Sequence, residues 1–300
     1  MMEGSLLRDI RSRYIEELKD RYPPEEITHM FHLLTAHFFG FPRTLIAMEP
    51  RKELDPSQEN LLLGALDRLK QDTPVQYITG KAWFMDLELE VSPSVLIPRP
   101  ETEELVRWVL ESFRDTEKPH RILDIGTGSG CIALGIKSRW QGAEVQAMDL
   151  SEAALEVARR NAGTTGLEVL FRQDDIQNPK KGWPVFDLIV SNPPYVPEGD
   201  RASMQRHVVE AEPEVALFAP GWDPLGIYRD ILRFAAGHSI PGGWLYLEIY
   251  EAYGAAVCHL FREAGYGEIE LKKDIFGKDR FVRGRSPLKR SARSDQKQRK

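Results

Sequence analysis

The feature that most constrains the fold is a glycine-rich turn between a predicted strand and a predicted helix. Residues 121–125 form a short apolar run typical of a buried strand, residues 126–130 read Gly-Thr-Gly-Ser-Gly, and residues 131–137 begin a helix. From here the chain alternates strands and helices, which predicts a parallel sheet. The glycines let the backbone approach a ligand closely, and the helix start offers free N–H groups. We therefore expect a ligand site at the carboxyl edge of this sheet.

An acidic residue at the end of the next predicted strand supports that site. Residues 144–148 predict a strand, and Asp149 follows it about twenty residues after the glycines, where a carboxylate can bind a ribose diol. Three details favour S-adenosylmethionine over NAD: Asp124 precedes the turn, the spacing is Gly-x-Gly-x-Gly, and no second dinucleotide-binding half follows. A tight turn that binds nothing is the other reading, and Asp149 disfavours it.

The most informative segment for chemistry is the end of another predicted strand, the fourth along the chain. Residues 186–191 are an apolar run that stops at Asn192, Pro193, Pro194 and Tyr195. Two prolines cannot continue a strand, and each fixes φ and removes an N–H, so the segment presents carbonyl oxygens and the Asn192 side chain beside an aromatic ring. Such an acceptor-rich pocket suits a planar group that carries an NH2. Taken alone, the motif is also compatible with a strand-ending turn and an incidental tyrosine.

Further strands are expected at residues 167–171, 242–249, 269–271 and 280–282, which brings the total to the seven of a Rossmann-like methyltransferase. Asp174 and Asp175 follow the strand at 167–171, and one of them, preferably Asp175, is expected to reach the adenine amino group. The long segment 196–221 lies beside the expected site and has little periodicity, so we expect it to cover the substrate.

The chain before residue 80 has a different pattern. Apolar residues recur at helical spacing over residues 3–20, 24–38, 43–48 and 57–70, which predicts a small helical domain with a recognition role. Residues 83–91 and 95–97 are expected to pair as a hairpin that links the domains. The expected organisation is a helical domain at 1–80, a β-hairpin linker at 81–98, a methyltransferase domain at 99–285 and a basic, disordered tail at 286–300.

Composition narrows the possible partners. The net charge is −6, yet residues 283–300 hold eight Lys or Arg against Asp295, so the body of the chain is acidic and a broad nucleic-acid footprint is disfavoured. No apolar run approaches the length of a membrane helix and the N-terminus does not resemble a signal peptide, so we expect a cytoplasmic protein. Cys131 and Cys258 lie too far apart to indicate a zinc site, and His29 and His32 lack further ligands. We expect no metal, and a monomer.

Taken together, the motifs resemble the HemK/PrmC family, the protein-(glutamine-N5) methyltransferases that modify peptide chain release factors. The resemblance covers residues 74–284, and its most specific parts are Pro-Val-Gln-Tyr-Ile-Thr-Gly at 74–80, Leu-Ile-Pro-Arg-Pro-Glu-Thr-Glu at 96–103, residues 122–134, Asn-Pro-Pro-Tyr at 192–195, Lys-Asp at 273–274 and Asp-Arg at 279–280. The Asn-Pro-Pro-Tyr element also occurs in adenine-N6 DNA and some RNA methyltransferases, and the block at 98–103 separates the two groups.

The resemblance implies a seven-stranded class I methyltransferase domain that uses S-adenosylmethionine. The implied substrate is the glutamine of the Gly-Gly-Gln motif in a class I release factor, with the helical domain gripping the factor elsewhere, in support of translation termination. The implied substrate-binding residues are Asn192, Pro193, Pro194 and Tyr195. The implied cofactor-binding residues are Gly126, Thr127, Gly128, Ser129, Gly130, Asp149, Asp175 or its neighbour Ile176, and Asn192.

Two departures from the family pattern bear on partner fit. Residues 220–225 read Pro-Gly-Trp-Asp-Pro-Leu where the family commonly has Gly-Gly-x-Asp-Gly-Leu, and Tyr250 stands where the family keeps a glycine. Two other functions are weighed against the family reading. One is a nucleobase methyltransferase that acts on an extruded adenine or guanine, and the other is a cofactor-binding scaffold without catalysis.

Overall fold

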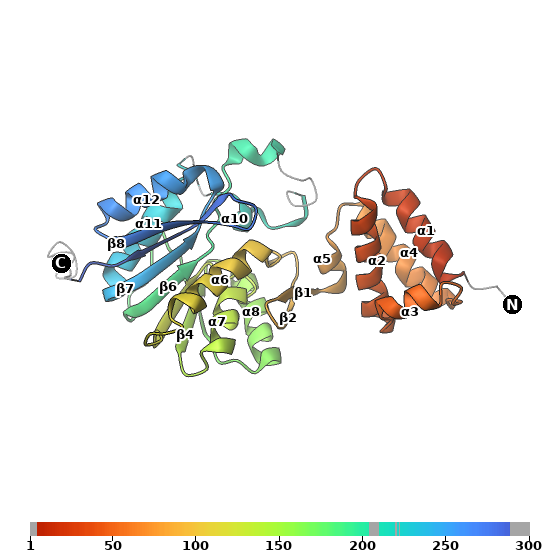
Figure 1. Cartoon of the computed structure of the whole chain (residues 1–300), viewed down its shortest axis with the longest axis horizontal. Coiled ribbons are helices and arrows are strands. Elements are labelled where there is room, and N and C mark those ends of the chain that lie inside the picture. The colour runs from red at the N-terminus through yellow and green to blue at the C-terminus, as the bar shows by residue number, and fades with distance from the viewer. Residues whose placement is uncertain (1–4, 204–209, 220, 222, 289–300) are drawn as a thin grey trace. The chain divides into compact units, whose positions relative to one another are not determined.

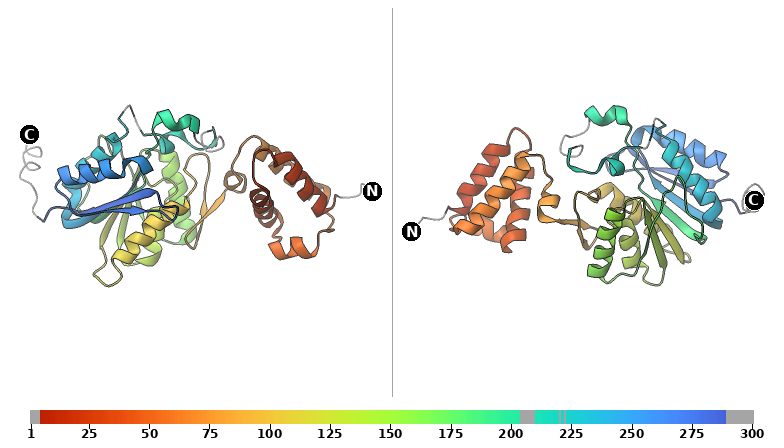
Figure 2. Two further views of the ribbon diagram at one scale, coloured as in Figure 1. Left: turned by 45° about the horizontal axis from the view of Figure 1, so that its top comes forward. Right: turned by 180° about the vertical axis from the view of Figure 1, so that it is seen from behind.

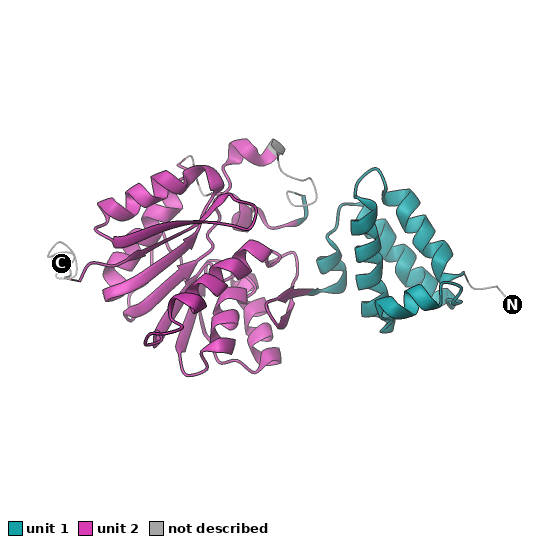
Figure 3. Cartoon of the chain, in the orientation of Figure 1, with its two compact units in different colours: residues 1–81, 205–211 teal, residues 82–204, 212–300 magenta. Residues whose placement is uncertain are grey.

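The computed structural model describes residues 5–203, 210–219, 221 and 223–288. These form two compact units: residues 5–81 with 210–211, and residues 82–203 with 212–288 (Figure 3). From residue 289 onward, the basic tail expected at 286–300 lies outside the described residues. No described helix is long and apolar enough to cross a membrane.

The smaller unit is helical, as the apolar spacing predicted. Its helices are α1 Leu7–Leu18, α2 Pro24–Phe39, α3 Arg43–Met48, α4 Pro56–Lys70 and α5 Val75–Thr79 (Figure 1). Helix α4 begins with a capping box, in which Asp55 accepts the backbone N–H of Gln58 and the Gln58 side chain accepts the N–H of Asp55. The apolar faces meet in one core, where the Tyr14 hydroxyl donates to the Leu62 carbonyl.

The larger unit contains a seven-stranded sheet, which confirms the predicted number of strands. The strands are β3 Arg121–Ile125, β4 Glu144–Asp149, β5 Leu170–Gln173, β6 Phe186–Ser191, β7 Ser239–Glu248, β8 Gly267–Lys273 and β9 Asp279–Arg285. Their order across the sheet is β5-β4-β3-β6-β7-β9-β8. Strands β3 to β7 pair in parallel, whereas β9 pairs antiparallel with both β7 and β8.

Helices cover both faces of this sheet (Figures 1 and 2). They are α6 Pro100–Ser112, α7 Cys131–Arg139, α8 Glu152–Thr165, α10 Glu214–Leu217, α11 Gly226–His238 and α12 Gly254–Glu263, with short 3-10 turns η1 Glu198–Ser203 and η2 Glu251–Tyr253. Alternate residues of β6 enter opposite cores: Ile189 packs with α11 and α12, while Leu188 and Val190 pack with α6 and α7. A strand buried on both faces explains why residues 188–190 are consecutively apolar.

The expected linker hairpin forms with different strands from those predicted. The two-stranded sheet pairs β1 Lys81–Phe84 with β2 Leu87–Glu90, and Val95 to Ile97 form no strand. The chain already reverses at Met85, whose φ of 53° belongs to a tight turn, so the run at 83–91 is two strands rather than one. The Ile97 N–H donates to a Glu212 side chain instead of to a strand partner. The pairing of 83–91 with 95–97 was therefore wrong.

The register of the parallel strands places four chain positions in one row. The paired residues are Met148 on β4, Ile125 on β3, Ser191 on β6 and Leu247 on β7. The residues that follow them at the carboxyl edge are Asp149, Gly126, Asn192 and Glu248. Because parallel strands present their carboxyl ends at one edge, this register alone brings a carboxylate, a glycine turn, an amide and a second carboxylate together.

Candidate active site

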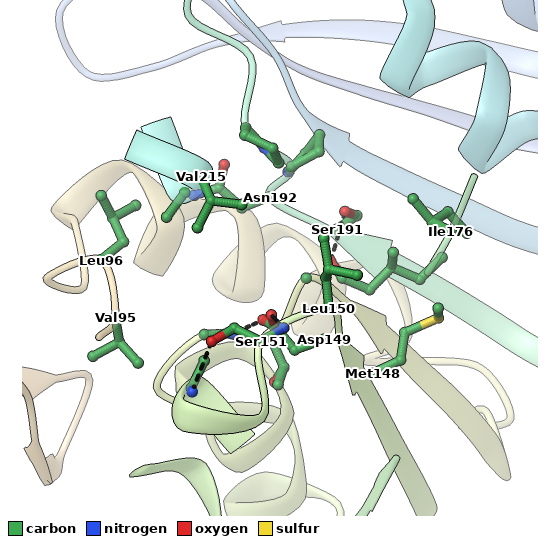
Figure 4. Close-up of a pocket in the computed structure, with 18 of the residues that line it drawn as sticks. Val95, Leu96, Met148, Asp149, Leu150, Ser151, Ile176, Ser191, Asn192 and Val215 are labelled. Atoms are coloured by element: carbon green, nitrogen blue, oxygen red, sulfur yellow. Dashed lines mark hydrogen bonds between the residues drawn. The ribbon is translucent and has the colours of Figure 1, made fainter. Parts of the chain in front are cut away.

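A cavity of about 410 Å³ lies at the carboxyl edge of the sheet, wholly within the larger unit. Figure 4 shows its walls: Val95 and Leu96 from the linker, Met148 to Ser151 at the end of β4, Ile176 after β5, Asn192 after β6, and Val215 from α10. The predicted site residues that line it are Gly126, Thr127, Gly128, Ser129, Asp149, Asp175, Ile176, Asn192, Pro193 and Pro194. Gly130 and Tyr195 lie next to these residues in the chain but do not line the cavity.

The glycine turn has a backbone that side chains would disfavour. Gly126, Gly128 and Gly130 all have φ between 54° and 84°. At Gly130 space is limiting as well, because an added Cβ would lie 3.2 Å from the Cβ of Ala158 on α8. Gly130 therefore lets α7 and α8 approach each other, whereas Gly126 and Gly128 shape the wall of the cavity.

Asp124, the residue before the last one of β3, forms hydrogen bonds to this turn and to the start of α7. Its Oδ2 accepts the Thr127 hydroxyl at 2.6 Å and the Ala133 N–H at 3.2 Å. Complete burial raises the pKa of Asp124 to about 7. Its Oδ1 and the Ser129 hydroxyl are buried without a hydrogen-bond partner among the described residues. Buried polar atoms of this kind are commonly satisfied by a ligand or water.

Asp149 connects two elements at the cavity edge. Its Oδ2 accepts the Gly128 N–H at 2.8 Å, and its Oδ1 accepts the Ser151 N–H at 2.9 Å. Burial raises the pKa of this carboxyl, and the backbone hydrogen bonds oppose the shift. The Ser151 hydroxyl in turn accepts the Ala154 N–H and caps α8. The carboxylate is thus fixed beside the glycine turn.

Asp174 and Asp175 both line the cavity but differ in what holds them. Asp174 is buried, and its carboxylate accepts the Trp183 indole N–H at 2.6 Å and the Lys180 N–H at 3.0 Å. Among the described residues, the Asp175 carboxylate accepts the Gln177 N–H and the Asn178 side chain, both at exposed positions. Asp174 therefore shapes the strand end, and Asp175 is the acid with acceptor capacity left.

The Asn-Pro-Pro-Tyr segment leaves β6 at the centre of the row. The Ser191 hydroxyl donates to the Ile125 carbonyl at 2.7 Å and joins β6 to the start of the glycine turn. The Asn192 side-chain Nδ2 donates to the Thr102 hydroxyl oxygen at 3.0 Å. The Tyr195 hydroxyl donates to Glu248 Oε1 at 2.9 Å. Both polar ends of the segment are therefore tied to neighbouring elements.

Two residues of this arrangement were missed by the sequence analysis. Thr102 was named only as part of the block at 98–103, without a role of its own, and its hydroxyl donates to Glu248 Oε2 at 2.8 Å. Glu248 was not singled out as a site residue. It is almost fully buried, and burial raises its pKa to about 7. The available signal was an acid that ends an apolar strand beside β6 in the sheet.

The segment after Tyr195 returns to the cavity through α10. Val196 pairs with Phe218 through a single parallel bridge, and Val215, Ala216 and Phe218 contribute to the cavity wall. Before α10, the buried Glu212 accepts the Arg99 guanidinium at 2.5 Å and the Ile97 N–H at 3.3 Å. This carboxylate fastens the returning segment to the Pro-Arg-Pro-Glu block.

Metal binding has no support in the part of the chain that the structure describes. It contains no group of three or more His, Cys, Asp or Glu side chains that could hold an ion. His32 instead accepts a hydrogen bond at Nδ1 from the Arg43 guanidinium.

Comparisons with known proteins cover both units. The methyltransferase small domain model matches residues 105–216, and the PrmC N-terminal domain model matches residues 9–80. A release factor glutamine methyltransferase of Bacteroides thetaiotaomicron is 40% identical over 89% of this chain and 95% of its own length. One of Flavobacterium psychrophilum is 35% identical over 93% of this chain and 98% of its own length.

A solved structure supports the fold independently. A methyltransferase from Pyrococcus furiosus is 19% identical, covers 75% of this chain and 98% of its own, and superposes with a TM-score of 0.50. At this identity it bears on the fold alone. The matches to the two curated relatives cover 89% and 93% of this chain, which is more than either unit alone. The chain belongs to the release factor glutamine methyltransferase family.

Proposed function

We propose that this protein transfers a methyl group from S-adenosylmethionine to the side-chain amide nitrogen of the glutamine in the Gly-Gly-Gln motif of a class I release factor. The observation that carries this proposal is the position of Asn192, Pro193 and Pro194 in the same cavity as the glycine turn and Asp149. A methyl donor and a planar amide can then meet at one sheet edge. The names of the curated relatives agree with the substrate class.

The residues around the cavity fit S-adenosylmethionine. The Asp149 carboxylate is held at the cavity edge with acceptor capacity left for a ribose diol. Leu150 and Ile176 offer apolar surface for a purine ring, and Asp175 offers an acceptor for its amino group. Two buried polar atoms, Asp124 Oδ1 and Ser129 Oγ, lack partners near the glycine turn, where the amino-acid portion of the cofactor would lie.

The main requirement of this reaction is that the substrate amide be oriented toward the methyl group. An amide nitrogen is a weak nucleophile because its lone pair is delocalised into the carbonyl. S-adenosylmethionine supplies a methyl group that its sulfonium has already activated. Asn192 Oδ1 and the Pro193 carbonyl would accept the two amide hydrogens, aim the nitrogen along the transfer line and favour its pyramidalisation. Tyr195 does not itself line the cavity, and its ring would pack against the amide plane of a glutamine bound beside Pro194.

The methyl transfer does not require a strong base, because the amide nitrogen loses its proton only after the new bond has formed. With the cofactor bound, its carbon–sulfur bond would break with the electron pair left on sulfur, and the nitrogen lone pair would form the new carbon–nitrogen bond. The methylated nitrogen then carries a surplus proton, which is strongly acidic and passes to water. Accordingly, the role of the chain in this step is to hold the amide and to stabilise charge that develops on its nitrogen.

The helical unit and the segment after Tyr195 would supply partner recognition. The smaller unit contains none of the cavity residues and matches the PrmC N-terminal domain model, in keeping with a role in gripping the factor away from the glutamine. Release factors act in translation termination, so the proposed place of action is the cytoplasm.

Methyl transfer from labelled S-adenosylmethionine tests the proposal. A purified class I release factor, the same factor with its Gly-Gly-Gln glutamine changed, duplex DNA and structured RNA are incubated separately with the enzyme. Label on the intact factor alone is the expected result. Label on nucleic acid would instead support a nucleobase methyltransferase, and cofactor binding without any labelled product would support a non-catalytic scaffold.

A further inference from the structure

The residues that surround Asn192 form a chain of hydrogen bonds whose direction is fixed while Glu248 is ionised. Asn192 Nδ2 lies 3.0 Å from Thr102 Oγ1, and Thr102 Oγ1 lies 2.8 Å from Glu248 Oε2. The other oxygen of Glu248 lies 2.9 Å from the Tyr195 hydroxyl. Thr102 and Glu248 have relative exposures of 2% and 1%, so water does not compete for these groups.

The direction follows from what each group can donate. An ionised carboxylate only accepts, so both hydroxyls must donate their protons to Glu248. Thr102 has then used its one proton and can only accept from Asn192. Asn192 must therefore present its NH2 to Thr102, which leaves Oδ1 as the atom it can offer to a substrate. This conclusion does not depend on how the two ends of the amide were assigned.

Among the described residues, no hydrogen bond to Asn192 Oδ1 is present, and Asn192 lines the cavity. The opposite orientation would point NH2 at the substrate, where it would meet the hydrogens of an incoming amide. One buried carboxylate thus selects the useful face of Asn192 through Thr102 and fixes the Tyr195 ring directly. Arg280 contributes favourable charge, which lowers the pKa of Glu248 and opposes the effect of burial.

We infer that Thr102 and Glu248 are positioning residues for methyl transfer, which turn the acceptor face of Asn192 toward the substrate amide and hold Tyr195 beside it. This inference rests on the proposed function, because it assigns these residues to the same amide-binding motif. It also gives a role to the Pro-Arg-Pro-Glu-Thr-Glu block, which precedes the glycine turn by more than twenty residues in the chain. This block supplies Thr102, the residue that accepts the hydrogen bond from Asn192 Nδ2.

The test compares Thr102→Val with Thr102→Ser. Valine keeps the shape of threonine but removes the hydroxyl, so kcat is expected to fall roughly tenfold while the affinity for S-adenosylmethionine stays within about twofold. Serine keeps the hydroxyl and is expected to recover most of kcat. The matched control is Thr35→Val: this threonine is also buried, its hydroxyl donates to the Phe31 carbonyl, and it is not one of the residues that line the cavity.

A double-mutant cycle separates positioning from a structural effect. If Thr102 acts through Asn192, Thr102→Val costs little further activity when Asn192→Ala is already present. Equal losses in both backgrounds would overturn the inference, as would a wild-type kcat for Thr102→Val. Should Thr102→Val fail to fold, Glu248→Gln carries the test, because one of its two acceptor atoms becomes a donor without a change of shape. A wild-type kcat for that variant would also overturn the inference.

Labelling of a release factor by the wild-type enzyme separates this test from the test of the proposed function. If the wild-type protein does not label a release factor, the proposed function fails before any variant is read. If it does label the factor and the Thr102 and Glu248 variants match it, only the positioning role fails.

Discussion

Asn192 and Glu248 occupy equivalent positions at the carboxyl ends of the neighbouring strands β6 and β7, because Ser191 of β6 pairs with Leu247 of β7. Thr102, from α6, completes the connection between them. The amide-binding motif is thus held by a residue of the next strand and by a helix that precedes the whole parallel sheet in sequence. This relationship makes the geometry of the site a property of the fold rather than of the loop alone.

Removing the Asn192 side chain is expected to impair catalysis more than folding. Asn192→Ala deletes the proposed acceptor for the substrate amide, and loss of one such oriented group typically lowers kcat by about 10²–10³-fold. Single-turnover methyl transfer at saturating cofactor measures this. Near wild-type transfer by a variant that still binds cofactor would refute the proposed role of Asn192.

Asp149 is expected to govern cofactor affinity. Asp149→Ala removes the proposed acceptor for the ribose hydroxyls. It also removes the hydrogen-bond acceptor of the Gly128 and Ser151 N–H groups, so the affinity for S-adenosylmethionine should fall by about 10–100-fold. Asp175→Asn is the comparison, since an amide at 175 keeps one acceptor for an adenine amino group and should change affinity less. Calorimetric titration distinguishes the two. A larger loss for Asp175→Asn would reverse this assignment.

The charge of Glu248 should make activity fall at mildly acidic pH. Its pKa is raised from 4.5 to about 7, chiefly by burial, so it gains a proton as the pH drops through 7. A protonated carboxyl can no longer accept from both hydroxyls. The titratable or charged groups that act on it are Tyr195, Tyr228, Arg280, Glu101 and Cys131.

This acid limb should not reflect unfolding. A carboxyl whose pKa is higher in the folded state binds its proton more tightly there, so its contribution to stability falls as the pH rises from about 4.5 to 7 and is regained on acidification. Activity should therefore drop in a range where this group stabilises the fold. The kcat profile of Glu248→Gln is the control and should lack the limb near pH 7. An unchanged limb in that variant would assign it to another group.

Two glycine substitutions should change stability in opposite directions. Gly130→Ala places a Cβ at φ 84° and 3.2 Å from the Ala158 Cβ, so it should destabilise the protein by about 1–3 kcal/mol. Gly163→Ala lies on the exposed side of α8, with nothing within 4 Å of an added Cβ, and should stabilise the helix by up to about 1 kcal/mol. Denaturant unfolding checks both. A neutral Gly130→Ala would contradict the close approach of α7 and α8.

Tyr250 is expected to act on the substrate side. Its hydroxyl donates to Asp200 Oδ2 at 2.5 Å, and its ring lies 6.2 Å from that of Tyr195. This hydrogen bond is the main cause that raises the pKa of Tyr250 to about 12. Tyr250→Phe should raise KM for the release factor several-fold, since it frees the segment that follows Tyr195, and should leave cofactor affinity unchanged. Unchanged KM would separate this tie from substrate binding.

The features that could be predicted from the sequence are those whose residues are close together in the chain. The apolar run at 186–191 and the glycines at 126–130 predicted a strand and a turn because those signals are contiguous, and parallel strands bring their ends together without further information. The contact between Thr102 and Glu248 spans 146 positions of the chain, so no spacing rule points to it. The linker hairpin was placed wrongly because a tight turn at Met85 leaves the alternation of the flanking strands intact.

The proposed function requires methyl transfer to one glutamine of a release factor. The most direct test is mass spectrometry of a purified class I release factor after incubation with enzyme and S-adenosylmethionine, beside the same factor with its Gly-Gly-Gln glutamine changed to alanine. We expect a single added methyl group on that glutamine in the intact factor, and no added mass in the altered factor. A methyl group at another residue, or equal labelling of both proteins, would contradict it.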